Sequence, residues 1–152
     1  QVALRLLSEY DDVYVVVGES LIGGRLNVRG DRVRVLRDFP NSLYFNSFDF
    51  AILAGGYNSY HEAIEFQLPT ICIPNTSTGM DDQIARANVA GSAEAMAVLV
   101  NPNESELSNA INNMVSSEYR EQMSNAASAL RKSNGADELS NRLIDLMKFN
   151  GN

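Results

Sequence analysis

The sequence is poor in the residues on which several kinds of site depend. Its 152 residues include one cysteine, Cys72, one histidine, His61, and no tryptophan. A single cysteine cannot form an intrachain disulfide, and its isolation excludes a cysteine-rich zinc site. One histidine cannot anchor a histidine-rich metal site, and Asp11 and Asp12 do not form a convincing metal pair. We therefore expect neither a disulfide nor a bound metal.

Positive charge and long apolar runs are also scarce. Twelve Lys and Arg stand against 19 Asp and Glu, a net charge of −7, so the chain lacks the basic footprint of a nucleic-acid-binding protein. No apolar run approaches the roughly 18 residues of a membrane span, and no secretory signal opens the chain. The composition predicts an acidic, cytoplasmic domain that binds no nucleic acid.

Over residues 1–100, short apolar runs alternate with amphipathic stretches. Five runs are typical of strands, at residues 13–17, 33–36, 50–53, 70–73 and 97–100. Helical periodicity precedes them at residues 2–10 and lies between them at residues 57–67 and 81–90, with a short helix or turn at 40–48. This alternation predicts an α/β fold, a Rossmann-like parallel sheet flanked by helices. Because the first run is continuous and β-branched, we expect its strand to be covered on both faces.

The last third of the chain is predicted to be helical. Apolar residues form three stripes, at residues 107–115, 119–130 and 139–147, and we expect these to pack into the core rather than bind a partner. A doubly wound domain usually opens with a strand and a Gly-rich turn, whereas this sequence opens with helical periodicity. We therefore expect residues 1–152 to be one domain, a fragment of a longer polypeptide that lacks the domain's first strand.

The segment after the third predicted strand is the most informative. Gly55 and Gly56 allow a tight turn into a helix, whose N-terminal N–H groups and dipole favour a phosphate or diphosphate. Asn58 and Glu62 share one side of that helix, where a carboxylate can accept hydrogen bonds from two ribose hydroxyls. The alternative is a capping box formed by Ser59 and Glu62, which needs no ligand and which the pattern alone favours.

A second candidate segment, which is acidic, follows the fourth predicted strand. Asp82 and Gln83 could donate and accept hydrogen bonds with sugar hydroxyls, and Arg86 follows one turn later as a cation for a diphosphate. The alternative roles are helix capping for Asp81 and Asp82, and a solvated surface charge for Arg86.

The residues that carry these features resemble a known family. The stretch GGYNSYHEAIEFQLPTICIPNTSTGMDDQIARANVA is similar to the nucleotide-sugar-binding half of glycosyltransferases with the GT-B fold. It resembles the C-terminal domain of glycosyltransferase family 28 and, more loosely, the macrolide and plant UDP-glycosyltransferases. The motifs lie within roughly residues 33–100, and the order of elements extends the resemblance over nearly the whole chain.

The resemblance implies a role for each matching residue. The implied nucleotide-binding residues are Leu36, Arg37, Gly55, Gly56, Tyr57, Asn58, Ser59 and Glu62. The implied donor-sugar residues are Asp82, Gln83 and Arg86. Leu36 and Arg37 would meet the base largely through backbone atoms, and Glu62 would hold the ribose. Many relatives have His or Arg where this chain has Ala54. We therefore expect weaker binding of the diphosphate in this chain.

The implied activity is transfer of a sugar from a nucleotide diphosphate, commonly UDP, to an acceptor hydroxyl, with inversion and without metal or cofactor. The general base and acceptor site would lie in an N-terminal domain or partner subunit, so no catalytic residue is expected in this chain. His61 is expected to be structural, and any peripheral membrane association to belong to the full-length protein. The alternatives are a sugar-nucleotide epimerase or hydrolase, and a non-catalytic half of a split transferase.

Overall fold

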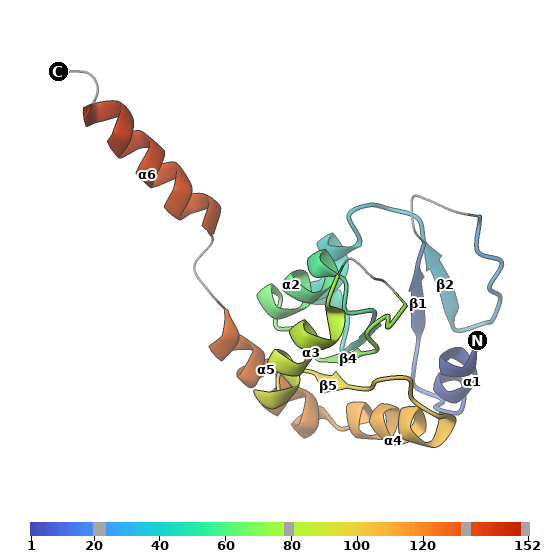
Figure 1. Ribbon diagram of the computed structural model, residues 1–152. Coiled ribbons are helices and arrows are strands. Elements are labelled where there is room, and N and C mark those ends of the chain that lie inside the picture. The colour runs from blue at the N-terminus through green and yellow to red at the C-terminus, as the bar shows by residue number, and fades with distance from the viewer. Residues whose placement is uncertain (20–23, 78–80, 132–134, 150–152) are drawn as a thin grey trace.

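The computed structural model describes residues 1–19, 24–77, 81–131 and 135–149 and forms a layered α/β body from which the last helix projects (Figure 1). The strands are β1 (Val15–Gly18), β2 (Val33–Leu36), β3 (Ala51–Leu53), β4 (Thr70–Cys72) and β5 (Ala97–Val98). The helices are α1 (Val2–Leu7), the 3-10 helix η1 (Asn41–Ser47), α2 (Tyr57–Glu65), α3 (Gln83–Ser92), α4 (Glu104–Val115), α5 (Ser117–Leu130) and α6 (Gly135–Phe149).

All strand pairs are parallel, as the alternation of elements predicts, but they form two sheets. One sheet contains β1 and β2, and the other has the order β3-β4-β5. The register places Val15 opposite Val33 in the first sheet and Ile52 opposite Ile71 in the second. The predicted α/β class is confirmed, while the single continuous sheet is replaced by two short ones.

Strand β4 is the centre of the core because its residues alternate between two apolar clusters. Ile71 packs with α1, α4 and the start of α5, and Cys72 packs with α2, α3 and the end of α5. Both side chains are essentially inaccessible to solvent. The first two apolar stripes of the last third pack into these clusters as expected, through residues such as Ile111 and Met123. The second sheet is therefore covered on both faces, and this packing holds the carboxyl ends of its strands in place.

The expectation that the first strand is covered on both faces is wrong. Val15 packs toward the cluster that contains α1 and α4, but Val16 on the opposite face is 42% exposed. Among the described residues, no helix follows β1 before β2, so nothing in that part of the chain covers this face.

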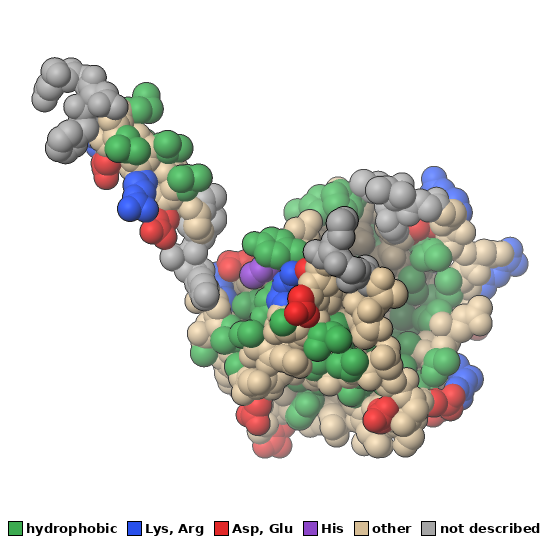
Figure 2. All heavy atoms as spheres, in the orientation of Figure 1, with side chains coloured by type: hydrophobic (Ala, Val, Ile, Leu, Met, Phe, Trp, Pro, Cys, Tyr) green, Lys and Arg blue, Asp and Glu red, His purple; other side chains and the backbone are tan. Residues whose placement is uncertain are grey.

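The third stripe was also expected in the core, and this expectation is wrong. Helix α6 extends away from the body, and its apolar side chains are exposed (Figures 1 and 2). The exposed residues are Leu139, Leu143, Ile144, Leu146 and Met147. The periodicity correctly indicates an amphipathic helix, but this stripe is not buried against the other described residues. None of the helices in the described ranges is both long enough and apolar enough to cross a membrane.

Candidate functional site

The turn between β3 and α2 presents open backbone donors, as the sequence predicts. Gly56 is the N-cap of α2, with φ −60° and ψ 149° and no side-chain cap. The Tyr60 N–H donates to the Gly56 carbonyl at 2.9 Å, so the N–H groups of Tyr57, Asn58 and Ser59 precede the first intrahelical bond. A Cβ added at Gly56 would meet no atom within 4 Å, so the described residues leave the backbone of this N-cap residue open on that side.

The capping box considered for this helix does not form. Ser59 lies inside the first turn of α2 rather than at the N-cap, and no side chain caps the helix. The carboxylate of Glu62 instead accepts a hydrogen bond from the hydroxyl of Ser42 in η1, with 2.9 Å between Oγ and Oε1. Ser42 is only 8% exposed, and Glu62 is half-buried. Glu62 therefore has a role other than capping, and in the described residues Ser42 is the only hydrogen-bond partner of its carboxylate.

Other carboxylates near this edge are already engaged. Asp38 accepts hydrogen bonds from the Phe39 N–H and from the Tyr44 hydroxyl. Asp81 is paired with a guanidinium, and Asp82 caps a helix. Within the part of the chain that the structure describes, Glu62 has no cationic partner and one oxygen without a hydrogen bond. Asp82 also keeps one oxygen without a hydrogen bond, but it is exposed, whereas Glu62 is half-buried. Glu62 is thus a partly buried carboxylate that can still accept hydrogen bonds from a ligand.

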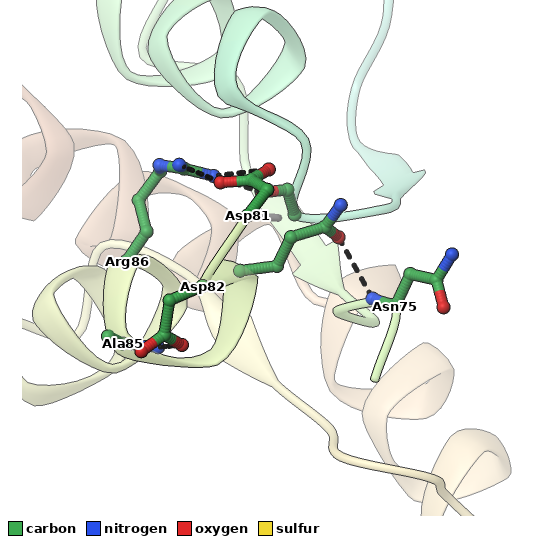
Figure 3. Close-up of polar contacts among 7 residues, drawn as sticks. Asn75, Asp81, Asp82, Ala85 and Arg86 are labelled. Atoms are coloured by element: carbon green, nitrogen blue, oxygen red, sulfur yellow. Dashed lines mark hydrogen bonds and ion pairs between the residues drawn. The ribbon is translucent and has the colours of Figure 1, made fainter. Parts of the chain in front are cut away.

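Arg86 connects three parts of the site (Figure 3). Its Nη1 donates to the Gly55 carbonyl at 2.8 Å, and its guanidinium forms an ion pair with Asp81. The same guanidinium lies over the ring of Tyr57, 5.3 Å from its centroid. The alternative of a freely solvated arginine is wrong, since only 19% of this side chain is exposed. The hydrogen bond from Arg86 also lowers the pKa of Asp81, and the opposite charge of Arg86 adds to this effect.

Asp82 and Gln83 both have structural partners. Asp82 is the N-cap of α3, and its Oδ1 accepts a hydrogen bond from the Ala85 N–H at 2.9 Å (Figure 3). Gln83 is 8% exposed, and its Oε1 accepts from the Asn75 N–H at 2.9 Å, which fixes the chain just after β4. The capping alternative for Asp82 is therefore confirmed, whereas Asp81 pairs with Arg86 instead. Residues 78–80, in the segment that precedes Asp82, lie outside the described residues.

Sequence reasoning missed Glu19, which organises the end of the first sheet. Its Oε1 accepts a hydrogen bond from the Leu26 N–H at 2.6 Å, and its Oε2 faces Arg37 at 3.0 Å and Arg25 at 3.3 Å. The Leu26 N–H, followed by the two arginines, holds the pKa of Glu19 below its ordinary value. The Leu36 carbonyl accepts from the Glu19 N–H at 2.9 Å. Leu36 and Arg37, the two residues expected to contact the nucleobase, are thus both held by Glu19, which belongs to no sequence motif.

An apolar rim borders the carboxyl edge. Phe39, Leu43 and Tyr57 are each more than 60% exposed. The His61 ring packs against Tyr57, with 4.4 Å between the ring centroids, and is exposed. His61 thus belongs to this rim, and its expected structural role stays a prediction. The exposed residue Ala54 follows β3 beside the Gly55-Gly56 turn and offers no charge to a diphosphate.

Comparison with known proteins identifies the family. Residues 31–143 match the glycosyltransferase family 28 C-terminal domain, and the chain belongs to this family. Among curated proteins, none matches the sequence significantly. In solved structures, spinosyn forosaminyltransferase SpnP matches with a TM-score of 0.64 at 20% identity, over 85% of this chain and 32% of that one. The glycotransferase of kitacinnamycin matches with a TM-score of 0.66 at 17% identity, over 93% of this chain and 38% of that one.

These likenesses confirm that the fold is that of the C-terminal half of a GT-B glycosyltransferase. The chain spans about a third of the length of the two solved proteins.

Proposed function

We propose that this chain binds the nucleotide-sugar donor of a glycosyltransferase that transfers a sugar from a UDP-sugar to an acceptor hydroxyl. The family supports this proposal, and one feature of the site carries it. One carboxylate oxygen of Glu62 has no hydrogen-bond partner in the described residues. Glu62 lies on α2, whose uncapped N-terminal N–H groups follow the Gly55-Gly56 turn. A carboxylate and free N–H groups on one short helix match a ribose joined to a diphosphate.

The diphosphate would lie against the N–H groups of Tyr57, Asn58 and Ser59. These donors and the positive end of the α2 dipole stabilise negative charge. Arg86 contributes little net charge because Asp81 already neutralises it, but it holds the carbonyl of Gly55 and so shapes the turn. The missing cation at Ala54 is therefore offset mainly by backbone donors.

During transfer, the acceptor oxygen would form a bond to the anomeric carbon while the bond from that carbon to the diphosphate oxygen breaks. The charge that develops on the leaving diphosphate would be stabilised by the N-terminus of α2, without a metal ion. The acceptor proton would pass to a general base in an N-terminal domain or partner subunit. A single displacement of this kind inverts the anomeric centre.

The donor sugar would extend toward Asp82 and Gln83 at the start of α3. Asp82 uses Oδ1 to cap the helix, and its exposed side chain leaves the other oxygen for a sugar hydroxyl. Gln83 uses its amide oxygen for Asn75, and its amide also hydrogen-bonds the Asp81 carboxylate, so only the second donor hydrogen of its NH2 group would serve a sugar hydroxyl.

Calorimetric titration of UDP into this chain and into Glu62→Ala tests the proposal. We expect the variant to lose about 1.5 kcal/mol or more of binding free energy, roughly tenfold in Kd. Glu65→Ala is the matched control, because Glu65 lies on the same helix and pairs with Arg131 at the surface. UDP binding that is absent, or that survives unchanged in Glu62→Ala, would contradict the proposal.

A second experiment separates transfer from the other reactions of related sugar-nucleotide enzymes. We expect UDP-sugars incubated with this chain alone to remain intact, because the acceptor and general base are supplied by another domain. Release of UDP, or conversion of the sugar to its epimer, would indicate a hydrolase or epimerase instead.

A further inference from the structure

The contact between Ser42 and Glu62 connects two elements that are distant in sequence. Ser42 lies in the first turn of η1, and Glu62 lies in the second turn of α2. Their side chains meet at 2.9 Å, with the hydroxyl donating to Oε1. Because Ser42 is 8% exposed, water cannot easily replace this hydrogen bond.

Helix η1 is held firmly enough to make Ser42 a fixed reference point. Phe45, three residues further along η1, is buried and packs edge-on against Phe66 at the end of α2, with 5.8 Å between ring centroids. At the start of η1, Asn41 lies so close to Gly18 that a Cβ added there would be 2.6 Å from Nδ2. Ser42 therefore sits between two packed contacts, which limit the movement of its backbone relative to α2.

A glutamate side chain without such a contact would sample several rotamers. Glu62 is half-buried, and in the described residues no arginine or lysine pairs with it to limit its orientation. The Ser42 hydroxyl occupies Oε1 and fixes the direction of the carboxylate. Oε2 then keeps its lone pairs for an incoming ligand, and the ordering entropy of the side chain is lost on folding rather than on binding.

We propose that Ser42 is a positioning residue that orients Glu62 and thereby sets the preference of the site for a ribose with free hydroxyls. This inference rests on the proposed function, because it takes Glu62 as the ribose-binding group. A site built to accept hydrogen bonds from hydroxyls rejects analogues that lack them, and the rejection is sharper when the acceptor is fixed. Removing the Ser42 hydroxyl lowers this discrimination without removing the carboxylate.

The test compares UDP with 2′,3′-dideoxyuridine diphosphate by calorimetry. We expect the wild-type chain to prefer UDP by about tenfold or more. In Ser42→Ala the Kd for UDP rises about three- to tenfold, while the Kd for the dideoxy analogue stays the same. Ser47→Ala, in the same 3-10 helix but exposed, leaves both constants unchanged, and Ser42→Thr, which keeps a hydroxyl, recovers much of the preference.

The outcomes separate this inference from the proposed function. If Glu62→Ala keeps the wild-type preference for UDP, the ribose role of Glu62 fails and the positioning role fails with it. If Glu62→Ala loses the preference but Ser42→Ala retains it, only the positioning role is overturned. Equal weakening of both ligands in Ser42→Ala means a general structural role and also overturns it. Should Ser42→Ala not fold, Ser42→Cys, similar in volume but a weaker donor, gives the same comparison.

Discussion

Arg86 and Gly55 are joined across two loops, because Nη1 of Arg86 donates a hydrogen bond of 2.8 Å to the Gly55 carbonyl. The donor belongs to the first turn of α3, and the acceptor belongs to the turn that precedes α2. The same guanidinium pairs with Asp81 and lies over Tyr57. Helix α3 therefore helps to shape the Gly55-Gly56 turn, which precedes the open N–H groups of α2.

Replacing Arg86 with Lys should disturb this turn although it preserves the charge. A lysine has no planar fork and cannot serve Gly55 and Asp81 together. We expect Arg86→Lys to lower Tm by about 3–8 °C and to weaken UDP binding. Thermal unfolding and UDP titration measure the two effects, with Arg142→Lys on the exposed face of α6 as the control. Unchanged Tm and affinity would mean that the Arg86 contacts do not support the turn.

Asp82 offers a way to separate helix capping from sugar binding. Asp82→Ala removes both the cap and the charge, whereas Asp82→Ser keeps a capping hydroxyl. We expect the alanine variant to lose about 1 kcal/mol of unfolding free energy and the serine variant to lose little. Both variants should bind UDP normally and bind a UDP-sugar more weakly, because both lack the carboxylate. Normal UDP-sugar binding in both would limit Asp82 to capping.

Glu19 should make stability depend on pH. The Leu26 N–H, Arg37 and Arg25 lower the folded pKa of Glu19, so its contribution is complete above the ordinary value of 4.5 and is lost as the pH falls through the lower folded pKa. Glu19→Gln should therefore unfold a few degrees below the wild type at pH 7, and the two should converge in acid. Glu121→Gln, on an exposed helix face, is the control. A Tm difference that persists at low pH would point to packing rather than charge.

Helix α6 should contribute little to the stability of the body. Its apolar side chains are exposed, so a chain that ends at Arg131 loses no buried contact of the described α6 residues. We expect its Tm to stay within about 2 °C of the full chain. A chain that ends at Val115 should unfold, because it also loses α5 with the buried Met123 and Ala127. A large drop in Tm after removal of α6 alone would show that the helix packs on the body in solution.

The features predicted correctly from the sequence are mostly local. The Gly55-Gly56 turn and the start of α2 follow from neighbouring residues, and the buried side of that helix follows from its periodicity, as the positions of Tyr60 and Ala63 confirm. The capping role of Asp82 is local as well. The Ser59–Glu62 pattern alone favours a capping box, and this is wrong, because Glu62 bonds instead to Ser42, which lies 20 residues away.

The features that sequence reasoning missed depend on contacts between distant segments. Glu19 meets Arg37 from 18 residues away, and neither residue belongs to a recognisable spacing pattern. The stripe on α6 has the same periodicity as the buried stripe on α4, so periodicity indicates an apolar face but not whether a surface covers it. Likewise, the apolar run that forms β1 does not reveal that Val16 remains uncovered.

The division into two sheets affects how readily the molecule can self-associate through its sheet edges at high concentration. Five strands in one sheet would leave two edges, whereas the described sheets leave four, at β1, β2, β3 and β5. Each edge carries backbone groups that another chain can pair with. These strands are only two to four residues long, which limits the number of bonds that such a pairing could form. Resistance to self-association therefore depends on the shortness of the strands rather than on closure of the sheet.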